Sequence, residues 1–143
     1  MTYTVNIDGY WRENAISGIP SHSGVYFVYV GSYNASNDTV DLHKLVYIGE
    51  SVNVNNRIAK HEKWEDWKKH CGPGQQLCFS TGFVSSSSRN RVEAAYIFKH
   101  KPVENEEYKY SFPFDETTVK STGRTALLNS YFTVRRTQQS WYA

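Results

Sequence analysis

The chain has 143 residues, of which 39% are hydrophobic and 21% are charged, and its formal net charge is +2. This length predicts a single domain over residues 1–143 that can bury a core without disulfides. A net charge this small does not by itself indicate a protein that binds nucleic acid or another polyanion.

The N-terminal residues lack a basic start followed by an apolar run, so no secretory signal is expected. The longest apolar run, VYFVYV at 25–30, is far shorter than the roughly 20 residues that span a bilayer. Cys71 and Cys78 lack the spacing of a zinc site, although His70 lies beside them. We therefore predict a cytoplasmic protein with two free thiols and no membrane association.

The first half of the chain predicts two neighbouring strands after a polar lead-in. Residues 1–23 are broken by glycine and proline and are expected to be extended or looped. GVYFVYV at 24–30 is β-branched and aromatic, which favours a strand. Residues 31–43 are rich in Asn, Ser, Asp and Gly and predict a long loop, and KLVYIGE at 44–50 predicts a second strand, antiparallel to the first.

The second half predicts two helices around a third strand. A helix over 53–70, capped by Asn53 or Ser51, is expected to end at CGPGQ. A strand at 77–84 and a serine-capped helix to about His100 follow, and the residues at 107–143 form a C-terminal extension. The predicted fold class is α/β (α+β): a small three-stranded, mainly antiparallel sheet flanked by helices, in the order β-β-α-β-α.

Six polar residues stand out against these elements: Tyr26, Tyr47, Arg57, His61, Glu93 and Asn105. The two tyrosines fall on neighbouring predicted strands. Arg57 and His61 are four residues apart, so on a continuous helix they share one face. Glu93 is expected in the first turn of the second helix, with Asn105 just past its end.

This pattern resembles the GIY-YIG nuclease family. GVY at 24–26 stands where that family has its first tripeptide, and YIG at 47–49 is its second. An arginine ten residues after the YIG tyrosine, a histidine four residues further on, a helical glutamate and an asparagine after a proline also recur in the family. The resemblance covers roughly residues 23–106 and depends on the ordered set, because a lone YIG occurs by chance in many proteins.

The resemblance implies an endonuclease that hydrolyses phosphodiester bonds with Mg²⁺ or Mn²⁺, double-stranded DNA being the expected substrate. Tyr47, helped by Tyr26 and His61, would handle the attacking water. Arg57 would hold the phosphate, Glu93 would be the metal ligand, and Asn105 would make a supporting polar contact. A restriction enzyme acting as a homodimer and a phage or mobile-element nuclease both fit this description.

Each residue also has an ordinary structural explanation, so other classes stay open. The tyrosines suit core packing, and an arginine on a helix is usually solvated or paired. A catalytically inactive nucleic-acid-binding module with the same fold is the main alternative, and a purely structural protein is the third. Basic residues interleaved with aromatic ones suggest a surface that follows phosphates: Lys60, Lys63, Lys68, Lys69, His70, Arg89, Arg91, Lys99, Lys101, Arg124, Arg135 and Arg136, with Trp64, Trp67 and Tyr131.

Overall fold

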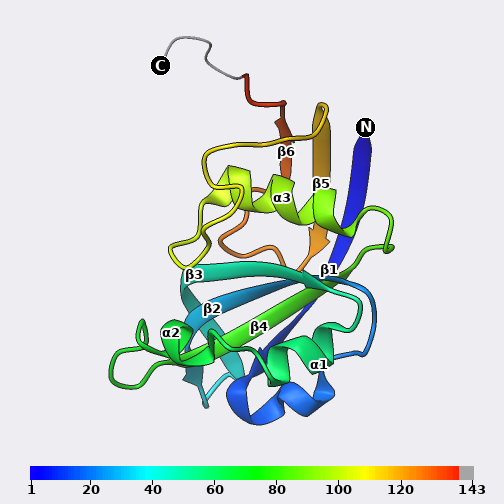
Figure 1. Ribbon diagram of the computed structural model, residues 1–143. Coiled ribbons are helices and arrows are strands. Elements are labelled where there is room, and N and C mark those ends of the chain that lie inside the picture. Colours follow the sequence, from blue (N-terminus) through cyan, green and yellow to red (C-terminus); the bar gives the residue numbers. More distant parts are fainter. Residues whose placement is uncertain (139–143) are drawn as a thin grey trace.

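The computed structural model describes residues 1–138, whose strands form one curled, mixed sheet (Figure 1). Its six strands lie in the order β3-β2-β4-β1-β5-β6. Neighbours are antiparallel except β1 and β5, which are parallel. The strands are β1 Thr2–Arg12, β2 Gly24–Asn34, β3 Thr39–Ser51, β4 Gln76–Phe83, β5 Thr117–Gly123 and β6 Tyr131–Val134.

In the described part of the chain, four helices cover this sheet: η1 Glu13–Gly18, a 3-10 helix, α1 Val54–Ala59, α2 Trp64–Lys68 and the longer α3 Arg89–His100. In Figure 1, α3 lies where the strand direction turns, between the transverse strands β2, β3 and β4 and the upright strands β5 and β6. The short helices α1, α2 and η1 lie at the opposite face of β2, β3 and β4. Within residues 1–138, no helix is long and apolar enough to cross a membrane.

The predicted fold class is wrong, because the sheet has six strands rather than three. The sequence interpretation missed β1, although Tyr3, Val5 and Ile7 alternate with polar residues as they do in a half-buried strand. It also missed β5, which has a single apolar residue, Val119. The two strands pair with each other over a long sequence separation, and each has a second neighbour, β4 for β1 and β6 for β5. Residues 107–138 thus contribute two strands, β5 and β6, to the sheet, and residues 139–143 of the predicted extension lie outside the described part.

Two connections also differ from expectation. The antiparallel pairing of the first two predicted strands is confirmed, but it continues to Asn34 and Thr39, so the predicted loop at 31–43 is mostly strand. The single helix predicted over 53–70 is two short helices. Asn53 does cap α1, since its side chain accepts a hydrogen bond from the Asn56 amide.

Alternation along β2 divides the core between the two faces of the sheet. Val25, Phe27 and Tyr29 belong to the cluster that contains the buried residues of α3. Tyr26, Val28 and Val30 belong to the other cluster, together with residues of α1 and α2. The two tyrosine motifs thus lie on β2 and on the edge strand β3. Both strands are contacted by α1 on one face and by α3 on the other.

Candidate active site

The backbone opposite Tyr26 is glycine because the tyrosine ring leaves no room for a side chain. Tyr26 on β2 is paired with Gly49 on β3. A Cβ at Gly49 would lie 2.2 Å from Cζ of Tyr26, far inside van der Waals contact. Tyr26 is 1% exposed, and burial raises the pKa of its hydroxyl, with Tyr47 adding to the effect and Arg57 opposing it. The glycine of YIG is thus explained by the tyrosine of GVY.

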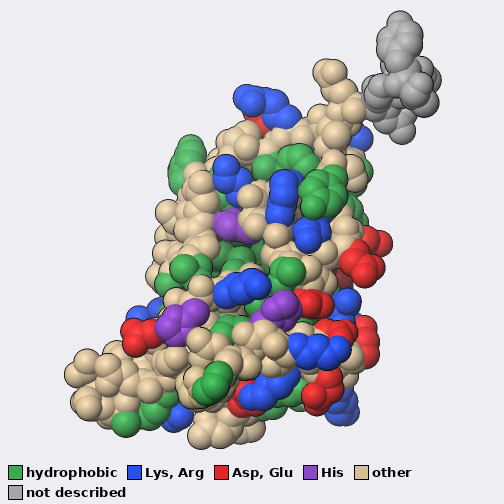
Figure 2. Space-filling view, turned by 90° about the vertical axis from the view of Figure 1, so that its left-hand side faces the viewer, with side chains coloured by type: hydrophobic (Ala, Val, Ile, Leu, Met, Phe, Trp, Pro, Cys, Tyr) green, Lys and Arg blue, Asp and Glu red, His purple; other side chains and the backbone are tan. Residues whose placement is uncertain are grey.

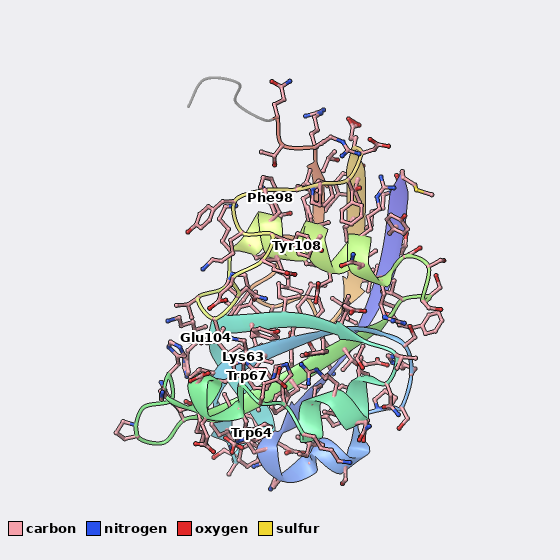
Figure 3. All side chains as sticks on the ribbon, in the orientation of Figure 1. Lys63, Trp64, Trp67, Phe98, Glu104 and Tyr108 are labelled. Atoms are coloured by element: carbon pink, nitrogen blue, oxygen red, sulfur yellow. The ribbon has the colours of Figure 1, made fainter. Side chains whose placement is uncertain are left out.

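His61 joins the two tyrosines in a cluster of aromatic rings, called here the tyrosine–histidine cluster (Tyr26, Tyr47, His61). Its ring centroid lies 5.3 Å from that of Tyr47 and 6.1 Å from that of Tyr26. Trp67 of α2 closes the other side at 4.4 Å. Figure 3 shows Trp67 on the side of the sheet that carries α2. The shared helix face expected for Arg57 and His61 is wrong, since α1 ends at Ala59; tertiary packing brings His61 to the tyrosines instead.

The protonation of His61 follows from its burial. Desolvation, reinforced by the positive charge of Arg57, lowers the pKa of His61 to about 4, so the ring is neutral at pH 7. Its Nδ1 accepts a hydrogen bond from the Lys63 amide at 3.0 Å. A neutral imidazole has one acceptor nitrogen, so Nε2 carries the proton, and it has no partner among residues 1–138. His61 in this state packs its ring against the two tyrosines and has no free lone pair to act as a base.

Arg57 lies between the Tyr26 hydroxyl and a carboxylate that sequence reasoning did not single out. Its guanidinium donates two parallel hydrogen bonds to Glu62, at 2.8 and 2.9 Å. The side chains of Arg57 and Glu62 are 38% and 66% exposed, so the fork is accessible from solvent. Hydrogen bonding from Arg57 lowers the pKa of Glu62 to about 2. The geometry is that of an arginine holding a planar oxyanion.

Glu93 and Tyr47 share a cavity of about 180 Å³, which Asn105 and Lys63 also line. Glu93 lies in the second turn of α3 rather than the predicted first turn. Burial, followed by the charges of Glu50 and Glu107, raises the pKa of Glu93 to about 8. Burial and the Glu93 carboxylate in turn raise the pKa of Tyr47 to about 12. The cavity therefore combines a tyrosine that keeps its proton at pH 7 with a glutamate whose charged form is disfavoured and has no cation beside it among the residues that raise its pKa.

Asn105 holds the strand that carries Tyr47. Its Oδ1 accepts from the Ile48 amide and its Nδ2 donates to the Ile48 carbonyl, each at 2.9 Å. Asn105 is 7% exposed, so these bonds satisfy two buried backbone groups at an edge strand. The Asn105 side chain thus forms with Ile48 the two hydrogen bonds that a neighbouring strand would otherwise make, and it fixes the backbone between Tyr47 and Gly49. The predicted supporting contact is thus to the protein backbone.

The donor set at Glu93 fits a divalent cation of the Mg²⁺ type. Residues 1–138 contain no group of three or more His, Cys, Asp or Glu side chains arranged to hold a metal. One carboxylate is enough for Mg²⁺, which usually keeps several waters and takes other ligands from substrate phosphate. Burial first, and then the charges of Glu50 and Glu107, raise the pKa of Glu93 and so disfavour its charged form, which a bound cation would stabilise.

The surface around the site has mixed charge. Figure 2 shows Lys and Arg side chains next to acidic, histidine and hydrophobic ones on one face of the molecule, without a field of one sign. Several of the basic residues expected to follow phosphates are neutralised locally. Arg89 pairs with Glu50 and also donates to the Ser23 hydroxyl at 3.0 Å, and Lys68 pairs with Glu13. A cation in the sequence is therefore not always a cation available to a ligand.

Comparisons of the chain with protein-family models, with curated proteins and with solved structures found no match. Any function assigned to it therefore depends on the chemistry and geometry of its own residues.

Proposed function

We propose that the protein is a metal-dependent endonuclease of GIY-YIG type that hydrolyses phosphodiester bonds in DNA. The observation that carries the proposal is the meeting of five elements at one place. Residues from β2, β3, α1, the segment after α1 and α3 contribute Tyr26, Tyr47, Arg57, His61 and Glu93. Core packing alone does not explain why the exposed guanidinium of Arg57 and the buried carboxyl of Glu93, with its raised pKa, lie next to two tyrosines.

The side chains divide the work by their exposure. Arg57 is exposed to solvent and holds the Glu62 carboxylate in its fork; in the nuclease it would exchange this carboxylate for the scissile phosphate and stabilise the charge that develops there. Tyr47, at the wall of the cavity, orients the attacking water through its hydroxyl. Tyr26 and His61 are buried and act as positioning residues, the first for Arg57 and the second for Tyr47.

Glu93 is the residue that would hold Mg²⁺ or Mn²⁺, and the cation would supply Lewis-acid stabilisation of the phosphate and of the leaving oxygen. Asn105 keeps Tyr47 in register with Glu93 by holding the backbone of Ile48. With Tyr47 near a pKa of 12, loss of its proton requires added positive charge, whereas orientation of water does not. Orientation of the water is therefore the role that we assign to Tyr47.

The test is cleavage of supercoiled plasmid DNA with Mg²⁺, beside EDTA and the variant Glu93→Gln. We expect nicking or linearisation that EDTA abolishes and that Glu93→Gln reduces by a factor of about 10²–10³, as for loss of a principal electrostatic group. Glu106→Gln is the matched control, because Glu106 lines the same cavity and is exposed. It should retain cleavage within a few fold.

Two outcomes would contradict the proposal. Equal activity of Glu93→Gln and wild type would identify a contaminating nuclease. Tight DNA binding without cleavage of plasmid or branched DNA would replace the enzyme by an inactive nucleic-acid-binding module. Discrete fragments, in contrast, would extend the proposal to a sequence-specific enzyme, whose two-strand cleavage would fit a homodimer.

A further inference from the structure

A second cavity, of about 290 Å³, lies at the other end of the β2–β3 hairpin. It is called here the arginine pocket, and the residues that matter in it are Tyr10 and Arg12 of β1, Tyr33 of β2, Asp38 of the turn, and Arg124 after β5. It shares none of the residues that line the candidate active site.

The two arginines of this pocket differ from all the others. The chain has seven arginines, and five of them have side-chain acceptors in the described part of the chain. Four pair with carboxylates, and Arg91 donates to Thr117 and to two backbone carbonyls. Arg12 and Arg124 have neither an ion pair nor a side-chain hydrogen bond within residues 1–138, and both line this one cavity.

Each unpaired guanidinium is nevertheless held in place. Arg12 stacks on the face of Tyr33, with Cζ 3.7 Å from the ring centroid, and this stacking leaves its N–H groups free at the rim. The Tyr33 ring is fixed because its hydroxyl donates to Asp38 at 2.7 Å. Arg124 follows Gly123, and its own amide donates to the Ile7 carbonyl at 2.9 Å. The nearby Tyr10 hydroxyl accepts from the Ala126 amide, which ties the Arg124 segment to β1.

The charge balance selects the ligand. Among the described residues, Asp38 is the one carboxylate that lines the pocket, and it already accepts a hydrogen bond from the Tyr33 hydroxyl. Two guanidiniums against one engaged carboxylate leave an excess positive charge in a concave polar site. Guanidinium forks match phosphate oxygens, and a diester phosphate carries the single negative charge that this excess offsets.

We propose that the arginine pocket binds a backbone phosphate of the nucleic-acid strand at a distance from the scissile bond. This inference rests on the proposed function. Tyr33 and Tyr26 lie seven residues apart on β2, a separation of roughly 23 Å at about 3.3 Å per residue. At about 3.4 Å per base pair, that corresponds to on the order of seven base pairs of duplex. The hairpin thus has a catalytic end and a positioning end.

The test measures duplex binding in EDTA as a function of salt, for wild type and for Arg12→Gln/Arg124→Gln. We expect the double variant to bind a duplex of about 20 base pairs at least tenfold more weakly at low salt. The slope of log K against log salt should be smaller by about 0.9 for each phosphate that the variant no longer neutralises.

Arg135→Gln/Arg136→Gln is the matched control, since it removes the same charge from exposed arginines that already have carboxylate partners. Arg12→Lys/Arg124→Lys keeps the charge and should retain most of the slope, which separates charge from misfolding. Equal weakening by the pocket variant and the control would overturn the inference. So would binding of inorganic phosphate to the pocket without any effect of the variant on duplex binding.

The two proposals fail separately. Cleavage by wild type with no special effect of the pocket variant would leave the nuclease and remove the pocket. Pocket-dependent binding without cleavage would remove the nuclease and leave a nucleic-acid-binding protein with this phosphate site.

Discussion

The candidate active site and the arginine pocket use arginine in opposite ways. In the active site, Arg57 is held by a carboxylate in the fork that a phosphate would occupy. In the pocket, Arg12 is held by an aromatic ring, and its donors stay unpaired within residues 1–138. The difference shows that the partner of an arginine, rather than its presence, decides whether a surface can take up an anion. It predicts a chemical role for the first region and a binding role for the second.

The largest expected effect separates chemistry from binding at Arg57. Arg57→Lys should lower kcat by about 10²–10³, because an ammonium cannot reproduce two parallel hydrogen bonds to the developing charge. Arg12→Lys should leave kcat within a few fold. The measurement is single-turnover cleavage at saturating protein. Equal reductions in the two variants would erase the distinction between the regions.

A buried histidine should make the active-site region sensitive to acid. The folded pKa of His61, about 4, is below the usual value of 6.5, so the unfolded chain binds more protons between these values. Stability from His61 is therefore present above pH 6.5 and is lost as pH falls toward 4, by about 3 kcal/mol in total.

The test of this pH dependence is urea unfolding at several pH values, compared between wild type and His61→Gln. The comparison is made as a difference because Glu93, with a raised pKa, gives a slope of opposite sign, and His100, with a lowered pKa, adds to the slope of His61. The free-energy difference between the two proteins should shrink as pH falls. A difference independent of pH would show that His61 is not buried as a neutral ring.

Asn105 should matter for stability more than any exposed asparagine. Asn105→Ala leaves the amide and carbonyl of Ile48 without partners, which costs about 2 kcal/mol of unfolding free energy. Asn56→Ala is the control, since Asn56 is exposed on α1. Urea unfolding at pH 7 measures both. A destabilisation equal to that of the control would mean that the Ile48 backbone finds other partners.

The smallest expected effect concerns the carboxylate in the Arg57 fork. Glu62→Gln should strengthen DNA binding by a factor of up to about five, because the exposed pair is worth no more than about 1 kcal/mol. Asp115→Asn, which removes an exposed partner of Arg136, controls for the change in net charge. Binding in EDTA compares the two. Equal effects would mean that Glu62 does not compete with phosphate for Arg57.

Local patterns in the sequence are enough to predict the elements that surround the site. The aromatic and β-branched run at 24–30 predicts β2, and Asn53 marks the start of α1 because its side chain satisfies a free amide there. The spacing of Tyr26, Tyr47, Arg57, His61 and Glu93 singles them out together, although their roles stay a prediction. Such patterns work because each depends on neighbours within a few residues.

The structure alone decided everything that depends on distant partners. Strands β1 and β5 pair across more than a hundred residues, and β5, with Val119 as its one apolar residue, has no apolar pattern of its own. Asn105 reaches the backbone of Ile48, and Trp67 buries His61 next to Tyr47. Burial and neighbouring charges set the pKa of Glu93. The folding of the chain also places Arg12 on the ring of Tyr33, without an ion pair within residues 1–138. These quantities depend on the three-dimensional surroundings of a side chain, which sequence spacing does not contain.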